Sequence, residues 1–261
     1  MLYHKTFRHP DAKDWVVFIH GAGGSSSIWY KQLRSFKEEF NVLLIDLRGH
    51  GQSQEMFERY FTNDYNFENI SRDVIDVMDH LNIEKGHFVG ISLGTIIIRT
   101  ICDMAPERAQ SLILGGAVTR LNVRSKILVA FGNAVKRLVP FMWLYRFFAW
   151  IIMPRRRNAE SRLLFISQAK KLAQKEFLKW FKLTNDLNPL LRYFNEKEVK
   201  LPTLYLMGDQ DYMFLPQVMS LVKQHQFSRL SIIENSGHVC NVEQPEVFNK
   251  LSIDFIKQHP A

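Results

Sequence analysis

Gly90-Ile91-Ser92-Leu93-Gly94 is the stretch on which the fold of this chain depends. Residues 86–89 before it form a short apolar run typical of a buried strand, and residues 95–102 after it are apolar enough for a buried helix. A Gly-x-Ser-x-Gly between a strand and a helix is typical of a nucleophile elbow, where a strained turn points the serine hydroxyl outward. The pattern alone is weak support, because short runs of common residues recur by chance. The rest of the chain must supply a base, an acid and an oxyanion hole.

Apolar runs typical of buried strands recur on both sides of this elbow, with helical patterns between them. The predicted strands cover residues 15–19, 41–45, 86–89, 110–116, 202–207 and 230–233. Helices are predicted from a cap at Ser25–Ser27 onward and over residues 67–81, 95–102, 216–224 and 245–257. This alternation predicts an α/β fold with a mostly parallel central sheet flanked by helices. Ligands bind outside the carboxyl ends of such strands, where His20, Asp46 and Ser92 are found.

The alternation breaks between residues 119 and 199. This segment has helical patterns and is rich in aromatic and basic residues, with fifteen Lys or Arg between Arg120 and Lys182 against two Glu. We therefore predict a core made of residues 1–118 and 200–261, with an inserted helical cap over residues 119–199. One cap helix is expected to carry an apolar stripe formed by Ile166, Ala169, Ala173, Phe177 and Trp180.

Residues 138–153 within this segment are strongly apolar. The run is too short for a bilayer span and contains Pro140 and Arg146, so a buried or interfacial helix is expected. Lys136, Arg137 and residues 155–157 flank it with positive charge. Apolar surface beside a basic cluster can bind anionic lipid, so weak peripheral membrane contact is one hypothesis. The lysine row of the next helix, Lys171, Lys175, Lys179 and Lys182, is interpreted as a solvated surface.

The composition narrows the function classes further. The chain is 46% hydrophobic and 23% charged, as is ordinary for a globular protein. Its two cysteines, Cys102 and Cys240, exclude a disulfide scaffold or a Cys-rich metal site. The first five residues lack the apolar core of a signal peptide, so the cytoplasm is the expected compartment. We expect a small-molecule substrate, no nucleic acid partner and no cofactor, while the oligomeric state is left open.

A serine hydroxyl needs a base, usually histidine, that a carboxylate orients. Beyond Ser92, an acid at one strand end followed by a histidine at the next is found only as Asp209 or Asp211 and then His238. The order Ser, Asp, His along the chain is that of the α/β-hydrolases.

The chain resembles an α/β-hydrolase of the cap-bearing, serine esterase-like kind over nearly its whole length. The resemblance is carried by His-Gly-x-Gly-Gly at 20–24, Asp-x-Arg-Gly-x-Gly-x-Ser at 46–53, the elbow, Gly-Asp-x-Asp at 208–211 and Gly-His at 237–238. It implies an α/β-hydrolase fold. It also implies that Ser92 is the nucleophile, Asp211 rather than Asp209 the acid, and His238 the base. The backbone N–H groups of Ala22 and Leu93 would form the oxyanion hole.

Two other histidines have simpler explanations. His20 is expected to be structural, stacking or bonding beneath its loop, and His50 to pack or cap within its glycine-rich loop. The spacing of His20, Asp46 and His50 follows no metal-ligand motif, so no metal site is predicted. Cys240 is expected to serve packing.

The resemblance implies acyl transfer through an acyl-enzyme on Ser92, with hydrolysis of a carboxylic ester of a small, largely apolar substrate as the leading case. A serine at the elbow disfavours the dehalogenase and epoxide-hydrolase branches, which use aspartate there. Lactonase, thioesterase and carbon–carbon hydrolase or lyase activities stay open, as does a ligand sensor without turnover. The cap aromatics predict a mostly apolar pocket, and they are Phe131, Phe141, Trp143, Phe147, Phe148, Trp150, Phe165 and Phe177.

Overall fold

The computed structural model describes residues 1–54, 65–136, 138–170 and 174–260. Seven strands form one sheet in the order β1-β3-β2-β4-β5-β6-β7, and all but β1 run parallel to their neighbours. The strands are β1 (His4–Phe7), β2 (Trp15–Ile19), β3 (Asn41–Ile45), β4 (Gly86–Ile91), β5 (Ala109–Gly115), β6 (Thr203–Gly208) and β7 (Ser228–Ile233). The predicted mostly parallel α/β fold is confirmed.

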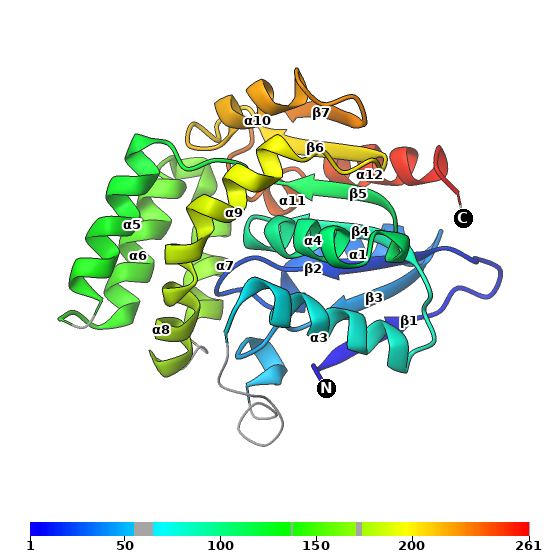
Figure 1. The fold of residues 1–261 in the computed structure, drawn as a ribbon, viewed down its shortest axis with the longest axis horizontal. Coiled ribbons are helices and arrows are strands. Elements are labelled where there is room, and N and C mark those ends of the chain that lie inside the picture. Colours follow the sequence, from blue (N-terminus) through cyan, green and yellow to red (C-terminus); the bar gives the residue numbers. More distant parts are fainter. Residues whose placement is uncertain (55–64, 137, 171–173, 261) are drawn as a thin grey trace.

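Helices cover both faces of this sheet (Figure 1). They are α1 (Tyr30–Lys37), α3 (Phe67–His80), α4 (Leu93–Met104), α10 (Leu215–Val222), α11 (Cys240–Glu243) and α12 (Pro245–Lys257). Successive strand residues alternate between two hydrophobic clusters: Val17 and Ile19 pack with α3 and α4, while Val16 and Phe18 pack with α1 and α12. Because both faces are buried, the strands read as continuous apolar runs.

In the described residues between β5 and β6 the chain forms five α-helices. They are α5 (Val123–Val135), α6 (Phe141–Ile152), α7 (Ala159–Ala169), α8 (Gln174–Lys182) and α9 (Thr184–Glu196). We call them the inserted helices. Leu144, Tyr145, Ala169, Phe177 and Phe181 form a small core of their own among these helices. Residues of α9 join the main core instead, so α9 ties the insertion to the sheet. That residues 119–199 form a separate cap unit stays a prediction.

Two local expectations differ from the structure. The antiparallel edge strand β1 was not predicted, because its four residues are mostly polar or charged and carry no apolar run. The single helix expected to carry Ile166 through Trp180 is instead two elements, α7 and α8. Ala173 of the predicted stripe lies outside the described residues. The helical period continued across this break, which is why the sequence pattern did not reveal it.

Candidate active site

Ser92 lies at the turn between β4 and α4, at the carboxyl end of a central strand. Its backbone has φ 54° and ψ −119°, a conformation that L-residues rarely adopt and that costs on the order of 1–3 kcal/mol. The start of α4 lies close to the end of β2, since a Cβ placed on Gly94 would lie 2.3 Å from the Ile19 carbonyl oxygen. The predicted elbow geometry is therefore present.

Ser92, His238 and Asp211 form a continuous hydrogen-bonded chain. Ser92 Oγ lies 2.9 Å from His238 Nε2, and His238 Nδ1 lies 2.8 Å from Asp211 Oδ2. Because a carboxylate can only accept, Nδ1 carries the proton and Nε2 is free to accept the serine proton. Asp211 and His238 are buried, whereas Ser92 is partly exposed. A hydroxyl, an imidazole and a carboxylate are thus within hydrogen-bonding distance although they come from three separate loops, which is the arrangement that a nucleophile, base and orienting acid would need.

Asp209 and Asp211 have different surroundings. Asp211 is 1% exposed, and its second oxygen accepts a hydrogen bond from the Phe214 N–H at 3.2 Å. Asp209 is exposed, and its Oδ1 accepts from the Ser236 N–H at 3.0 Å. Asp211 therefore contacts the His238 ring, while Asp209 stabilises the backbone of the loop that carries the histidine.

The loop around His238 is held by backbone contacts on two sides. Gly116, with φ +48°, lies so close that a Cβ there would sit 2.2 Å from the His238 carbonyl oxygen. The Gly237 N–H donates to Glu243 Oε2 at 2.8 Å, and Asn158 Nδ2 donates to the same oxygen at 2.7 Å. Asn158 immediately precedes α7, so the start of one inserted helix helps to hold the loop that carries His238.

The loop after β2 carries Ala22, whose N–H is expected to serve the oxyanion hole. A turn bond from the Gly24 N–H to the Gly21 carbonyl at 3.1 Å closes this loop. The Gly23 N–H donates to His50 Nε2 at 3.0 Å, and His50 Nδ1 donates to the Arg48 carbonyl at 2.8 Å. His50 thereby fixes the backbone next to Ala22 from a second loop, the one after β3.

His20 is used in the same way. Its Nε2 accepts from the Leu47 N–H at 3.0 Å and its Nδ1 donates to the Gly21 carbonyl at 2.8 Å. The rings of His20 and His50 are in contact, with centroids 5.1 Å apart and planes tilted by 56°. Burial lowers the pKa of His20 and lowers that of His50 to about 3, so both rings are neutral at pH 7. Both rings bond to backbone groups of their loops, in line with the packing and bonding roles expected of them.

Asp46 is also engaged by backbone groups. Its Oδ1 accepts from the Ser26 N–H at 2.6 Å and its Oδ2 accepts from the Gln52 N–H at 2.9 Å. These bonds join the loops after β2 and β3. In the part of the chain that the structure describes, no group of three His, Cys, Asp or Glu side chains is arranged to hold a metal ion. Cys240 is fully buried, in line with the packing role expected of it.

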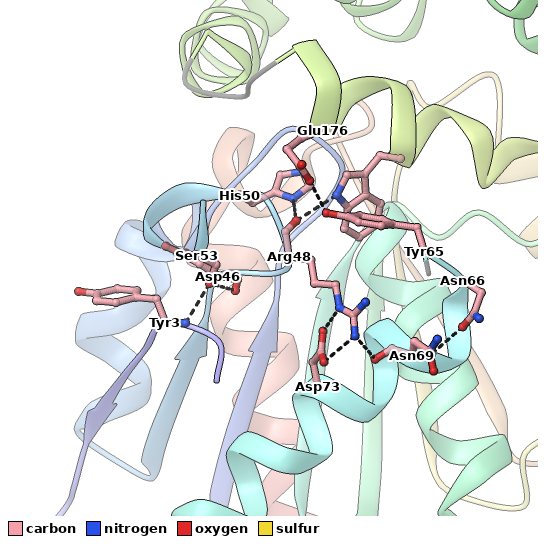
Figure 2. Close-up of polar contacts among 11 residues, drawn as sticks. Tyr3, Asp46, Arg48, His50, Ser53, Tyr65, Asn66, Asn69, Asp73 and Glu176 are labelled. Atoms are coloured by element: carbon pink, nitrogen blue, oxygen red, sulfur yellow. Dashed lines mark hydrogen bonds and ion pairs between the residues drawn. The ribbon is translucent and has the colours of Figure 1, made fainter. Parts of the chain in front are cut away.

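The inserted helices contact these loops through residues that the sequence analysis did not place at the site. The Trp180 Nε1–H donates to the Arg48 carbonyl at 3.0 Å, and its ring meets His50 edge-on at 4.9 Å. Tyr65 and Glu176 are hydrogen-bonded to each other beside this loop, with Glu176 reaching down from α8 (Figure 2). Such contacts join segments more than a hundred residues apart, so no local spacing could have indicated them.

Tyr145 of α6 is a second residue that the sequence missed. A Cβ on Gly23 would lie 2.7 Å from the Tyr145 hydroxyl oxygen, so the phenol rests on the loop that carries Ala22. Its ring is surrounded by Phe141, Phe165 and Phe177. The hydroxyl group of Tyr145 is a polar feature within the apolar run 141–152. Periodicity alone did not show which way this side chain points.

The aromatic residues expected to shape a pocket divide into two groups. Phe141, Phe148, Phe165 and Phe177 are buried or half-buried around Tyr145 and α8. Phe131, Trp143, Phe147 and Trp150 are exposed to solvent. A groove of about 1390 Å³ lies between α9 and α10, but Ser92, Asp211 and His238 do not line it. The buried aromatics around Tyr145 are therefore the ones near the loop that carries Ala22.

Comparisons with known proteins agree with this fold. The family model described as the alpha/beta hydrolase fold matches residues 14–245. The chain is 30% identical to "Putative carbamate hydrolase RutD" of Acinetobacter baylyi, covering 97% of each chain. It is 27% identical to 3-oxoadipate enol-lactonase 1 of the same organism, over 95% of this chain and 90% of the relative. A thermophilic esterase from Thermogutta terrifontis superposes with a TM-score of 0.81 at 18% identity, covering 100% of this chain and 94% of the esterase.

Proposed function

Since this chain belongs to the α/β-hydrolase fold family, we propose that it is a serine hydrolase that cleaves a carboxylic ester of a small, largely apolar substrate. The observation that carries this proposal is the hydrogen-bonded chain from Ser92 through His238 to Asp211. It supplies a nucleophile, a general base and an orienting carboxylate in the order that acyl transfer requires.

The first half-reaction forms an acyl-enzyme. Ser92 Oγ attacks the ester carbonyl as its proton passes to His238 Nε2, and Asp211 stabilises the imidazolium through Nδ1–H. The developing oxyanion accepts hydrogen bonds from the Ala22 and Leu93 N–H groups. The tetrahedral adduct collapses, the C–O bond to the alcohol breaks, and His238 returns its proton to the departing alkoxide.

The second half-reaction repeats these steps with water. His238 Nε2 takes a proton from water, whose oxygen attacks the acyl carbonyl, and the same two N–H groups bind the oxyanion. Collapse breaks the bond to Ser92 Oγ, which recovers the proton from His238. The products are one carboxylic acid and one alcohol, and no cofactor takes part in the balance.

Two features support a small and largely apolar acyl group. Tyr145 lies directly on the loop that carries Ala22, and the aromatics packed around Tyr145 extend an apolar wall away from that loop. Leu93 is partly exposed at the elbow itself. A bulky or multiply charged acyl group would lose solvation against these surfaces.

Turnover of p-nitrophenyl esters of increasing chain length tests the proposal, with Ser92→Ala as the control variant. We expect wild-type turnover to fall with long acyl chains, and the variant to lose on the order of 10⁴-fold or more in kcat. A serine-directed fluorophosphonate should label the wild type alone. Equal inertness of both proteins together with no labelling would overturn the proposal, whereas labelling without turnover would indicate a ligand sensor.

A cyclic ester is the second candidate substrate, because two enol-lactonases of A. baylyi are 27% and 26% identical to this chain over most of its length. In a lactone the leaving oxygen stays attached to the acyl group, so Ser92 would release a single hydroxy- or keto-acid. Side-by-side kcat/KM values for a small lactone and its open-chain ester separate the candidates. A ratio above about tenfold in favour of the lactone would assign lactonase activity.

A further inference from the structure

The outer surface of α5 is apolar where a surface helix is normally polar. Val123, Ile127 and Phe131 recur every four residues and therefore lie along one face, with Ile127 64% exposed. The residues on the opposite side of α5 pack inward, as Ser125 and Gly132 show by their burial. The exposed face is thus apolar like the inner one, and within the described residues no other helix packs over it.

The outer surface of α6 is apolar in the same way. Trp143, Phe147 and Trp150 share one face of the helix and are 70%, 44% and 57% exposed. Leu144, Tyr145 and Ala149 of the same helix are buried on the other side. An exposed tryptophan is unusual on a soluble surface, and two on one helix face exceed what scattered surface hydrophobics explain.

The two exposed faces form one surface. The rings of Phe131 and Phe147 meet across the helix pair with centroids 5.5 Å apart. Leu138, in the connection between α5 and α6, is 81% exposed. Figure 1 shows α5 and α6 side by side at the end of the molecule away from the chain termini. We call this surface the apolar insertion face, made of Val123, Ile127, Phe131, Leu138, Trp143, Phe147 and Trp150.

Positive charge surrounds this face. The sequence has no Asp or Glu from Arg120 to Ala159, while Arg124, Lys126 and Arg146 lie exposed on α5 and α6 themselves. Arg155 and Arg156, exposed after α6, continue the basic margin. Among the described residues, Arg124, Lys126 and Arg146 form no ion pair with an acidic side chain. Their charge is available to an external anionic partner.

We propose that the apolar insertion face docks the protein on an anionic phospholipid surface. Amphipathic surfaces with aromatic side chains on one side and Lys or Arg beside them insert into the headgroup boundary of a bilayer. A second copy of this chain fits less well, because a twofold contact through one patch would place Arg124 and Arg146 against like charges. No helix in the described part of the chain has the length and apolar character of a membrane span, so the contact would be peripheral.

Flotation with phosphatidylcholine vesicles, with and without about 30% phosphatidylserine, tests the proposal. Wild type should float only with the anionic vesicles. Trp143→Ala with Trp150→Ala should abolish flotation, whereas Phe227→Ala, which truncates an exposed aromatic on the core, should leave it unchanged. Ester turnover in solution should be the same in all three proteins, so a failure of docking is distinguishable from a failure of the proposed hydrolysis.

Charge is tested separately. Arg124→Glu with Arg146→Glu should reduce the vesicle partition coefficient at least about 25-fold, since each cation near an anionic surface contributes about fivefold. Lys223→Glu with Arg229→Glu makes the same change of charge on exposed core positions and should have little effect. Wild-type binding should weaken as NaCl rises from about 0.1 M to about 1 M, which shortens the screening length from about 10 Å to about 3 Å.

Tryptophan fluorescence gives an independent readout. Trp29 and Trp180 are buried and Trp15 is half-buried in the core strand β2, so a blue shift that depends on the apolar insertion face would come from Trp143 and Trp150. Trp143→Phe with Trp150→Phe should still float but lose the blue shift. No flotation of the wild type at low salt would overturn the proposal. So would a concentration-dependent dimer, seen by sedimentation without lipid, that the Trp→Ala pair abolishes, because the occupant would then be a second copy.

Discussion

At the scale of single residues, the site depends on which groups are left free to react and which are committed to the backbone. His20 and Asp46 directly follow strand ends, and His50 lies in the loop after β3, as a catalytic group would. Each of the three instead forms hydrogen bonds to backbone groups of neighbouring loops. His238 alone among these histidines is paired with a serine on one nitrogen and a carboxylate on the other. The hydrogen-bond partners, rather than the residue type, single out His238 as the candidate base.

The two acids near His238 are predicted to differ in kinetic effect. Asp211→Asn should lower kcat by about 10⁴-fold, because an amide at this position cannot hold Nδ1 in the protonated tautomer that leaves Nε2 free. Asp209→Asn should lower kcat by less than about tenfold, since its amide oxygen can still accept from the Ser236 N–H. Steady-state kinetics of both variants at one pH measures the difference. A larger loss in Asp209→Asn would reverse the assignment.

His50 is predicted to be a positioning residue for the oxyanion loop. His50→Phe removes the acceptor of the Gly23 N–H and leaves that group unpaired beside Ala22. We expect kcat to fall about 10–100-fold with a small change in KM, because the oxyanion contact is made only in the transition state. His50→Gln restores an acceptor and should recover part of the loss. A change confined to KM or to thermal stability would instead mean a purely structural role.

At the scale of elements, helix α8 and the loop after β3 act as one unit. Trp180 and His50 both donate to the Arg48 carbonyl, and Gly49 is close enough that a Cβ would meet the Glu176 carboxylate at 2.6 Å. The Arg48 side chain extends the other way and pairs with Asp73 of α3 (Figure 2). The loop after β3 therefore contacts a core helix, the loop that carries Ala22 and an inserted helix.

The buried pair of Arg48 and Asp73 leads to a stability prediction. Both side chains are 5% exposed, and Arg48 Nη2 donates to Asp73 Oδ1 at 2.8 Å. Asp73→Ala should lower the free energy of unfolding by about 3–5 kcal/mol, because it leaves the guanidinium buried without its counter-charge. Arg48→Met with Asp73→Leu should recover most of this loss.

Urea denaturation measures both variants. The exposed pair Lys250 and Asp254 provides the comparison, and Asp254→Ala should change the free energy by less than about 0.5 kcal/mol. Equal effects of Asp73→Ala and Asp254→Ala would show that burial of the first pair has no energetic consequence.

At the scale of the whole molecule, buried neutral histidines make stability depend on pH. Burial lowers the pKa of His50 to about 3 and that of His87 to about 4, from 6.5 in the unfolded chain. Below pH 6.5 the unfolded state therefore binds more protons, and stability falls as pH falls until the folded groups also titrate near pH 3–4. Each histidine should cost about 2 kcal/mol between pH 7.5 and pH 5.

Replacement of His87 isolates one of these contributions. His87 is fully buried in β4 and its Nδ1 lies 2.7 Å from Ser111 Oγ. His87→Phe with Ser111→Ala removes the titrating group and its partner together. Unfolding free energies of this variant at pH 7.5 and pH 5 should differ by about 2 kcal/mol less than those of the wild type. Identical pH dependence in both proteins would contradict the assignment.

The strand runs, the elbow at Ser92 and the order of acid and histidine could be derived from the sequence by itself. Parallel strands buried on both faces must be apolar throughout, and a strained strand-to-helix turn needs small neighbours, so both leave local patterns. The family match confirms the fold that these patterns predicted. The mostly polar strand β1 and the boundary between α7 and α8 left no such pattern.

Only the tertiary structure distinguished Asp211 from Asp209 by contact, placed Tyr145 on the oxyanion loop and showed Trp180 bonded to the Arg48 carbonyl. It also divided the aromatics of the inserted helices into a buried group and an exposed face. These features join residues far apart in the chain. Hydrophobic periodicity indicates that one side of a helix is apolar, but whether that side meets protein or solvent is decided by what packs against it.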